Sequence, residues 1–336
     1  KLLFLVTHGC CLKCEYCFVQ QNTQKYMSRK TSLKSVDLLM SSSANHLLLQ
    51  FFGGEPLMAP FELLKETINY ANKKANQEGK SLDIIITTNG VLLNKEKVDF
   101  FKKNNVIIEV SLDGNEIAQN INRPQQPGSP NSYPLIVKNL PLIFKEKIDC
   151  RASMVITPNT VDNLVGNFKH LIGLGFKKIF VMTSCGLCWS KRKLSLLRKN
   201  LNKLEPICFE LITKKQIQFL NLKDWLRPLR MNTEITVDFD GNIYPACISF
   251  LIHDEKTKEK FILGKIDKIK KTMDFFEGKR LSNSEAIQVI FSENDILDIL
   301  PNNIKAGEIM SNFVQSLSQK LINFNKKYEN ISMPKR

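Results

Sequence analysis

Three cysteines stand close together near the start of the chain, in the stretch THGCCLKCEYCF. Cys10, Cys14 and Cys17 follow the apolar run Leu2–Val6 with the spacing C-x3-C-x2-C. A cubane iron–sulfur cluster normally takes four cysteine thiolates, so a loop that supplies three leaves one iron open to another ligand. An open coordination position distinguishes a reactive metal site from a closed structural one. The spacing therefore predicts a reactive [4Fe–4S] site.

The same loop leaves an alternative open. Three thiolates with a fourth ligand such as His8 would also hold zinc, and Cys11 adds another thiol beside Cys10. Spacing alone favours the reactive iron–sulfur site over a zinc or structural site without deciding between them. Tyr16, directly before the last cysteine, is by itself an ordinary aromatic residue of a β-region.

Alternating strand-like and helix-like stretches must position this loop. Apolar runs typical of strands occur at Leu2–Val6, Leu47–Phe52, Leu82–Thr87, Val106–Leu112, Arg151–Thr157 and Lys178–Thr183. Helical periodicity occurs at Phe61–Ala75, Ser132–Lys147 and Val161–Leu174. This alternation predicts parallel βαβ units and an α/β fold, a partial or complete (β/α)6 TIM-like barrel. In such barrels the chemistry collects at the carboxyl ends of the strands.

Polar turns follow the predicted strands at that end. They are Gly53-Gly54-Glu55-Pro56 after the second strand, Thr87-Thr88-Asn89-Gly90 after the third and Ser111-Leu112-Asp113-Gly114 after the fourth. Glycines let a backbone approach a ligand closely, and a hydroxyl and a carboxylate can reach a ribose. Each turn alone is weak evidence, because Asx–Gly turns are common. Their succession after the cysteine loop is not expected by chance.

Together these motifs resemble the radical S-adenosylmethionine (radical SAM) enzymes over roughly residues 1–185. The resemblance implies that Cys10, Cys14 and Cys17 ligate a [4Fe–4S] cluster and leave Cys11 as a bystander. The open iron would chelate SAM, whose cleavage yields a 5′-deoxyadenosyl radical that abstracts hydrogen from a substrate. The family also implies the residues that position SAM: Tyr16 against the adenine, Gly53, Gly54, Glu55 and Pro56 at the amino group, then Asn89, Ser111 and Asp113, and the backbone near Thr157 and Met182.

The stretches FFGGEPLM, ITTNGVLL and VSLDG resemble the maturases that carry a C-terminal SPASM or twitch extension, among them anaerobic sulfatase-maturing enzymes. Residues 236–247, TVDFDGNIYPAC, resemble the hairpin of that extension, and Asp240-Gly241 is a hairpin turn signal in its own right. We therefore expect a radical SAM core at 1–190 and a small α+β twitch- or SPASM-like extension with a helical C-terminus at 191–336.

The cysteine count limits the metal content of the extension. A twitch domain uses one auxiliary cluster and a SPASM domain two, and no cysteine follows Cys247, so two are excluded. Cys185 and Cys188 form a C-x2-C pair after the sixth strand, and with Cys247 they are candidate ligands of one auxiliary cluster. The alternative is an extension that has lost its metal, with Cys247 as a structural thiol or, less strongly indicated, a hydrogen donor to a substrate radical. Cys150 and Cys208 are expected in the core.

Composition favours a cytoplasmic globular enzyme. The chain has 336 residues, of which 43% are hydrophobic and 24% charged, and no apolar run is long enough to span a membrane. No signal peptide is evident, and we expect a trimmed N-terminus because the chain does not begin with Met. The clustering of its nine cysteines favours metal binding over a disulfide framework.

The formal net charge of +15 suggests an acidic partner, although scattered lysines are also typical of a lysine-rich proteome. We predict that the chain modifies a peptide or protein substrate. If the positive charge serves substrate binding, that substrate carries an acidic leader. We also predict that an electron donor such as flavodoxin or ferredoxin reduces the protein. A radical SAM enzyme acting on RNA and a non-catalytic iron–sulfur protein are the alternatives. Nucleic acid is disfavoured because no basic, aromatic-rich β-barrel module follows the core. Crosslinking, epimerisation and oxidation are not distinguished by the sequence.

Two further segments carry structural expectations. The loop Gln125–Tyr133, which contains Pro127, Gly128 and Pro130, lies near the end of the fourth strand and is a candidate substrate gate. The last amphipathic stretch should pack back on the barrel through apolar residues at helical spacing, namely Met310, Phe313, Val314, Leu317 and Leu321.

Overall fold

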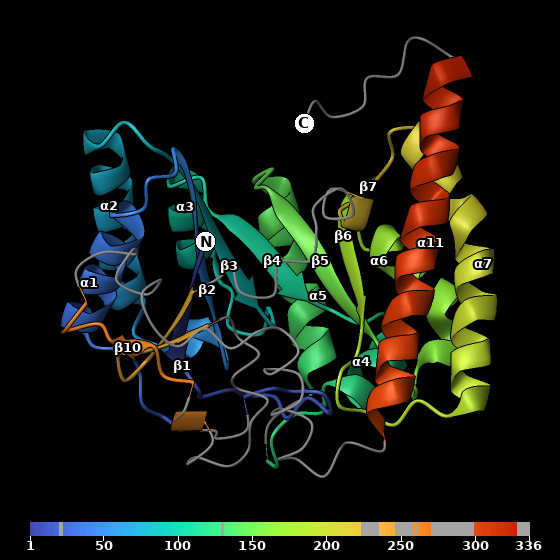
Figure 1. Ribbon diagram of the computed structural model, residues 1–336, viewed down its shortest axis with the longest axis horizontal. Helices are drawn as coiled ribbons and strands as arrows, with labels where there is room; N and C mark the ends of the chain where they lie inside the picture. The colour runs from blue at the N-terminus through green and yellow to red at the C-terminus, as the bar shows by residue number, and fades with distance from the viewer. Residues whose placement is uncertain are drawn as a thin grey trace.

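A single ten-stranded sheet runs through the computed structural model of the chain, in the order β10-β9-β8-β1-β2-β3-β4-β5-β6-β7 (Figure 1). The structure describes residues 1–19, 23–128, 131–222, 235–245, 258–259, 261–269 and 299–327. Strands β1 to β6 are neighbours in chain order and all parallel, as expected for repeated βαβ units. Within the described residues the sheet stays open, with β10 and β7 at its two edges.

The six predicted strands are confirmed, each shifted by at most one residue at either end. They are β1 (Leu2–Thr7), β2 (His46–Gly53), β3 (Ser81–Thr88), β4 (Ile107–Ser111), β5 (Cys150–Ile156) and β6 (Lys178–Thr183). The two-residue strand β7 (Gln218–Phe219) extends the parallel set beside β6 and has no clear signal in the sequence. Its brevity explains why periodicity does not reveal it.

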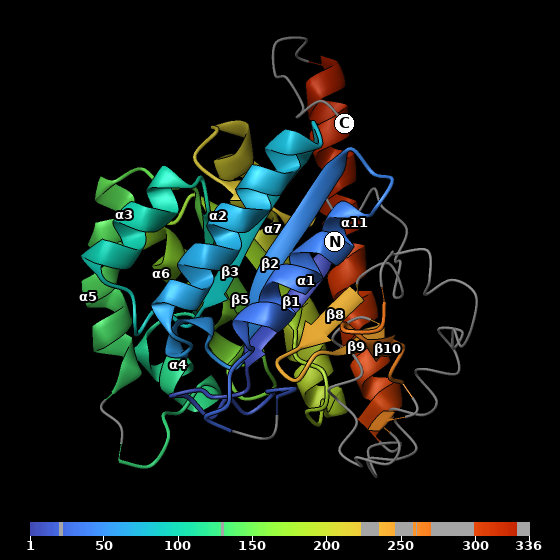
Figure 2. The ribbon, with the colours of Figure 1, turned by 90° about the vertical axis from the view of Figure 1, so that its left-hand side faces the viewer.

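Helices connect these strands and cover one face of the sheet (Figure 2). They are α1 (Arg29–Met40), α2 (Phe61–Gln77), α3 (Lys95–Lys103), α4 (Glu116–Asn122), α5 (Ser132–Lys145), α6 (Leu164–Gly173) and α7 (Lys191–Thr213), with short 3-10 turns at Pro56–Met58 and Val161–Asn163. Alternate strand residues such as Leu49 and Phe51 are buried with Leu64 and Ile68 of α2 in the main core. The intervening residues of each strand therefore point to the opposite face.

The hairpin expected in the extension is also present. Strand β8 (Ile235–Asp238) runs antiparallel to β9 (Asn242–Pro245), and β9 pairs with the two-residue strand β10 (Gly264–Lys265). Gly241 has a φ of +84°, and its N–H donates to the carbonyl of Asp238 over 2.9 Å, which closes the turn. Strand β8 is parallel to β1 and directly beside it, so the predicted extension continues the sheet of the predicted core. The boundary at residue 190 stays a prediction.

Helix α11 (Leu300–Lys327) packs along α7 on one side of the molecule (Figure 1). The apolar residues predicted for this stretch, from Met310 to Leu321, are all buried, so the expectation that it packs back on the fold is confirmed. Cys208 is fully buried on α7, as its apolar stripe predicts, and Cys150 is half-buried against the core. Helix-like sequence segments also occur at residues 268–279 and 284–300, which lie almost entirely outside the described residues. No helix in the described part of the chain is long and apolar enough to cross a membrane.

Candidate cofactor site at the strand ends

The cysteine loop, residues 10–17, crosses the carboxyl ends of the parallel strands from β1 towards α4. It is tied down by backbone hydrogen bonds to the segment after α4: Lys13 N–H donates to the carbonyl of Pro124 over 2.6 Å. In return, Gln126 N–H donates to the carbonyl of Cys11 over 3.0 Å. The first residues of the candidate gating loop therefore pair with the cysteine loop. Residues 129–130 of that loop lie outside the described residues, and gating stays a prediction.

A buried charge network fixes the second half of the loop. The hydroxyl of Tyr16 donates to Oδ2 of Asp113 over 2.5 Å, and Nη2 of Arg123 lies 3.1 Å from Oδ1 of the same carboxylate. Asp113 also accepts hydrogen bonds from the amide of Asn122 and the N–H of Val155. Its side chain has no exposed surface. The carboxylate expected to reach a ribose thus already has four protein donors.

Arg123 is a site residue that the sequence did not single out. Its guanidinium lies 5.2 Å from the ring centroid of Tyr16 and close enough to Cys14 for each to affect the other's pKa. Burial lowers the pKa of Arg123, but Asp113, Tyr16 and Cys14 together outweigh that effect and hold the pKa well above its usual value, so the group stays charged. Its buried Nε has no hydrogen-bond partner within the described residues. An arginine ten positions after a carboxylate carries no local sequence signal.

The Gly53–Pro56 turn packs directly against the chain that enters the cysteine loop. Gly54 N–H donates to the carbonyl of Thr7 over 2.9 Å, and Glu55 N–H donates to that of Gly9 over 2.7 Å. A Cβ on Gly54 would lie 2.3 Å from the carbonyl oxygen of Gly9, so only glycine fits. The sequence predicted that this glycine turn would let the backbone approach a ligand. In the structure, the backbone at Gly54 instead lies against the chain that enters the cysteine loop.

Glu55 connects the ends of β2 and β3 through a fully buried carboxylate. It accepts hydrogen bonds from the N–H groups of Leu57 and Asn89 and from the hydroxyl of Thr88, over 3.0, 2.7 and 2.8 Å. Burial nevertheless raises the pKa of Glu55 above its usual value, because desolvation outweighs these donors. Glu55 therefore has a clear role in holding the turn, in addition to any contact with a bound amino group.

Asn89 points from the end of β3 at the first two thiols of the loop. Its Nδ2 lies 3.3 Å from Sγ of Cys11 and 3.8 Å from Sγ of Cys10. A hydrogen bond from Cys10, with a further one from Asn89, lowers the pKa of Cys11 although burial raises it. The pKa of Cys10 is raised by the same Cys10–Cys11 bond and then by burial. In the metal-free protein, Cys11 is thus the more readily ionised of the pair.

The other two predicted ligands are neutral thiols without a metal. Burial raises the pKa of Cys14 to about 12, and it also raises that of Cys17. Thiolates must lose their protons to bind metal, so loading such a site releases protons. Within the described residues, no three His, Cys, Asp or Glu side chains converge on a single ion position. A cubane spreads its thiolates over separate irons, so three half-buried thiols on one well-anchored loop fit a cluster better than a lone zinc ion.

The remaining residues predicted to contact SAM lie around the same edge. Ser111 ends β4 half-buried and Met182 is 44% exposed on β6. Thr157 is fully buried, and its hydroxyl donates to Oδ1 of Asn122 over 2.7 Å. Among these three, Ser111 and Met182 have exposed surface, and Thr157 has none. Their contacts with SAM stay predictions.

The second pair of thiols lies at the end of β6 in different surroundings. Cys185 and Cys188 are both exposed. The loop between them is held by Asn303 of α11, which accepts a hydrogen bond from Gly186 N–H over 3.1 Å and donates one to the carbonyl of Leu187 over 3.0 Å. No acidic or histidine side chain joins them as a metal ligand within the described residues. Cys247, their predicted partner and the candidate hydrogen donor, lies outside the described residues.

A polar row crosses the face of the sheet opposite the helices. Gln50 of β2 donates to Thr87 of β3 over 2.8 Å, and Thr87 donates to Glu109 of β4 over 2.9 Å. Nε of Arg151 on β5 lies 2.7 Å from the second carboxylate oxygen of Glu109. In closed α/β barrels, the face of the sheet opposite the helices is usually filled by branched apolar side chains. The sequence did not reveal this row, because each member lies singly in a strand-like run.

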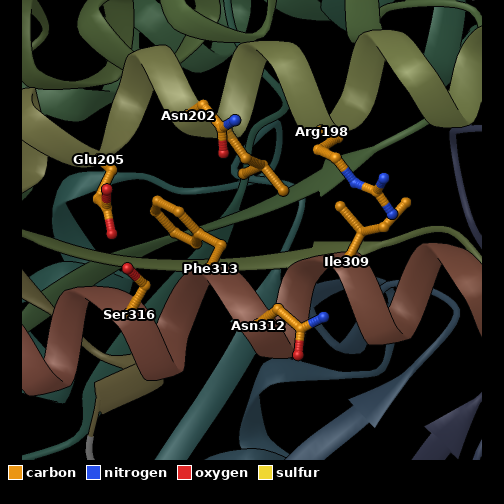
Figure 3. Close-up of a pocket in the computed structure, with 8 residues that line it drawn as sticks. Arg198, Asn202, Glu205, Ile309, Asn312, Phe313 and Ser316 are labelled. Carbon is orange, nitrogen blue, oxygen red and sulfur yellow. The ribbon is translucent and has the colours of Figure 1, made fainter.

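A separate pocket, open to solvent, lies between α7 and α11 (Figure 3). Arg198 and Glu205 stand towards its two ends and Phe313 lies between them. Glu205 is paired with Lys320, which neutralises that end. None of the lining residues belongs to the loops after β1 to β5, so this pocket is distinct from the cysteine loop site.

Comparison with known proteins places these features in one family. The profile of the radical SAM superfamily matches residues 4–187. A serine-type anaerobic sulfatase-maturating enzyme of Bacteroides thetaiotaomicron is 30% identical over 155 residues, 44% of this chain and 37% of that protein. An uncharacterised protein of Methanocaldococcus jannaschii is 30% identical over 178 residues, 53% of this chain and 60% of that protein.

Solved structures share the fold. One described as native anSMEcpe with bound AdoMet and Cp18Cys peptide has a TM-score of 0.70 at 18% identity, covering 92% of this chain and 99% of that one. SuiB of Streptococcus suis bound to S-adenosylmethionine has a TM-score of 0.56 at 17% identity, covering 76% of this chain and 61% of that one. The chain spans between about a third and three fifths of the curated relatives named above. Because the family profile covers more than half of the chain, and matches where the cysteine loop and strand-end turns lie, this protein belongs to the radical SAM superfamily of enzymes.

Proposed function

We propose that the chain uses a [4Fe–4S] cluster and SAM to abstract a hydrogen atom from a peptide or protein substrate. The single observation that carries this is that the Gly53–Pro56 turn is hydrogen-bonded to residues 7 and 9, directly before the C-x3-C-x2-C loop, at the strand ends and inside the region that matches the superfamily. Cys10, Cys14 and Cys17 would hold the cluster. When bound, the cluster supplies the electron that cleaves SAM to a 5′-deoxyadenosyl radical.

The residues around the loop have distinct tasks in this proposal. The charged guanidinium of Arg123, with an unpaired Nε within the described residues, is suited to bind the methionyl carboxylate of SAM. Tyr16, oriented by Asp113, presents an aromatic face for the adenine. Ser111 and Asn89 supply further polar groups at the ends of β4 and β3.

The substrate would lie on the face of the sheet opposite the helices. The row of Gln50, Thr87, Glu109 and Arg151 gives that face hydrogen-bonding groups in place of an apolar filling. A polar wall beside a radical centre suits a peptide, whose backbone offers both donors and acceptors. The anaerobic sulfatase-maturating relatives, and the structural neighbour bound to the Cp18Cys peptide, support this substrate class. Electrons would come from a cytoplasmic flavodoxin or ferredoxin.

The decisive experiment is anaerobic reconstitution with iron and sulfide, followed by SAM and dithionite. We expect 5′-deoxyadenosine to form even without substrate, because SAM cleavage requires only cluster and electron. Liquid chromatography with mass spectrometry measures the product. Cluster-loaded protein that forms no 5′-deoxyadenosine would contradict the proposal, and protein that binds zinc in place of iron would favour a structural metal site.

A further inference from the structure

A buried imidazole–carboxylate pair joins the hairpin of the extension to the chain that enters the cysteine loop. Nε2 of His8 lies 2.7 Å from Oδ1 of Asp238, although 230 positions separate the two residues. Their side chains are only 7% and 4% exposed. Asp238 also accepts the N–H of Phe239 over 2.8 Å, and the ring of Phe239 meets His8 edge-on at 4.8 Å. The hairpin thus contacts the imidazole of His8 in two ways, through the carboxylate of Asp238 at Nε2 and through the ring of Phe239.

The same short segment is held from the other side by the Gly53–Pro56 turn. The carbonyls of Thr7 and Gly9 accept the N–H groups of Gly54 and Glu55. A Cβ on Gly54 would lie 2.6 Å from the carbonyl oxygen of His8, so the two backbones are in close contact. The residues immediately before Cys10 are therefore clamped between β2 on one side and the β8–β9 hairpin on the other.

A polar pair at this place does more than hold two elements together. Burying an imidazole and a carboxylate costs free energy unless they are well hydrogen-bonded, and an apolar pair of similar volume is often at least as stable. A hydrogen bond adds a fixed direction, because its strength depends on angle as well as distance. Partners that orient the ligands of metal sites act in this way, and their loss typically weakens metal affinity or activity.

We propose that Asp238 is a positioning residue for the cysteine loop. Through His8 it fixes the backbone of residues 7–9 and hence the place of Cys10, so the extension supports the cluster site without itself binding metal. This rests on the proposed role of Cys10 as a cluster ligand. It gives the β8–β9 hairpin a function that does not require an auxiliary cluster.

The first test uses metal-free protein and needs no activity. The rate at which iodoacetamide alkylates Cys10 is measured by peptide mass spectrometry in the wild type and in Asp238→Ala, Asp238→Asn and Asp240→Ala. Asp240 is the matched control, because it lies exposed in the same turn and, within the described residues, its carboxylate accepts hydrogen bonds from Asn242 of that turn. We expect Asp238→Ala to change the rate by up to about tenfold, the equivalent of one hydrogen bond. Asp238→Asn, whose side-chain oxygen can still accept from His8, should stay close to wild type.

The second test uses reconstituted protein. Iron content, the EPR spectrum of the reduced cluster and its change on adding SAM are compared across the same variants and His8→Phe, which keeps the ring against Phe239 but cannot bond to Asp238. We expect an altered SAM-dependent spectrum in Asp238→Ala and His8→Phe, and a wild-type spectrum in Asp240→Ala. Circular dichroism checks that each variant is folded. If Asp238→Ala does not fold, the result for His8→Phe tests the inference in its place.

Two results would overturn the inference. One is wild-type alkylation and spectra in both Asp238→Ala and His8→Phe. The other is an equal disturbance in Asp240→Ala, which would reduce the effect to general loss of the turn. If the wild-type protein takes up no cluster, the proposed function fails. The alkylation of Cys10 would still test whether Asp238 positions the cysteine loop.

Discussion

Two loops of this protein present cysteines at the same edge of the sheet, yet their surroundings differ. The loop with Cys10, Cys14 and Cys17 is half-buried and bonded to the segments after β3 and α4, and the residues just before it are bonded to the turn after β2. The pair Cys185 and Cys188 is exposed, and among the described residues Asn303 holds the backbone between the two cysteines. Ligand spacing is present in both, so the supporting contacts, and not the spacing, favour the first as the proposed cofactor site.

The largest expected effect separates the two groups of thiols. Replacing Cys10, Cys14 or Cys17 by Ala should abolish SAM cleavage, because each removes one ligand of the cluster. Cys11→Ala, Cys185→Ala and Cys188→Ala should largely spare it. The measurement is 5′-deoxyadenosine formed per chain, with iron content determined for every variant. Loss of cleavage in Cys11→Ala equal to that in the other three would show that the ligand set is assigned wrongly.

The iron content of the wild-type protein sharpens the comparison further. We expect about four irons per chain after anaerobic reconstitution, since each cubane carries four and, within the described residues, the first loop alone has a side-chain network around its thiols. The double variant Cys185→Ser/Cys188→Ser should keep that value. About eight irons, falling to four in the double variant or in Cys247→Ala, would establish an auxiliary cluster and exclude Cys247 as a free thiol.

A smaller effect is expected at the turn that supports the first loop. Glu55→Ala should weaken SAM binding about tenfold or more, because a hydrogen-bonded buried carboxylate contributes about 1.5–3 kcal/mol. Isothermal titration of SAM into the reconstituted variant measures this, with Glu62→Ala, exposed at the start of α2, as the control. Unchanged affinity in a correctly folded Glu55→Ala protein would refute the role of this carboxylate.

The smallest effect concerns the alkaline stability of the metal-free protein. The Cys14 thiol ionises near pH 9.0 in an unstructured chain, but burial raises its pKa in the folded protein to about 12. Between these values the folded state binds more protons than the unfolded state, so stability falls as the pH rises. From pH 8 to 10 the wild type should lose about 1 kcal/mol more than Cys14→Ser. Urea unfolding at the two pH values measures the difference, and parallel curves for the two proteins would contradict the burial of this thiol.

Much of the fold follows from local pattern. Runs such as Leu47–Phe52 and Lys178–Thr183 carry enough β-branched and apolar residues to define their strands, and the turn at Asp240-Gly241 defines its hairpin. The cysteine spacing and the Gly53–Pro56 turn likewise located the candidate site, because their chemistry is concentrated in a few adjacent residues.

Only the tertiary structure decided the contacts between distant segments. Arg123 reaches Asp113 and Tyr16, and Asp238 reaches His8 across 230 positions, through side chains that have no neighbouring signal in the chain. The parallel order of the strands brings these segments to one edge, where burial makes each unpaired polar group costly and so selects its partner. The sequence by itself therefore determined which loop is the candidate to hold the cofactor, and the packing of the sheet determined which residues hold that loop in place.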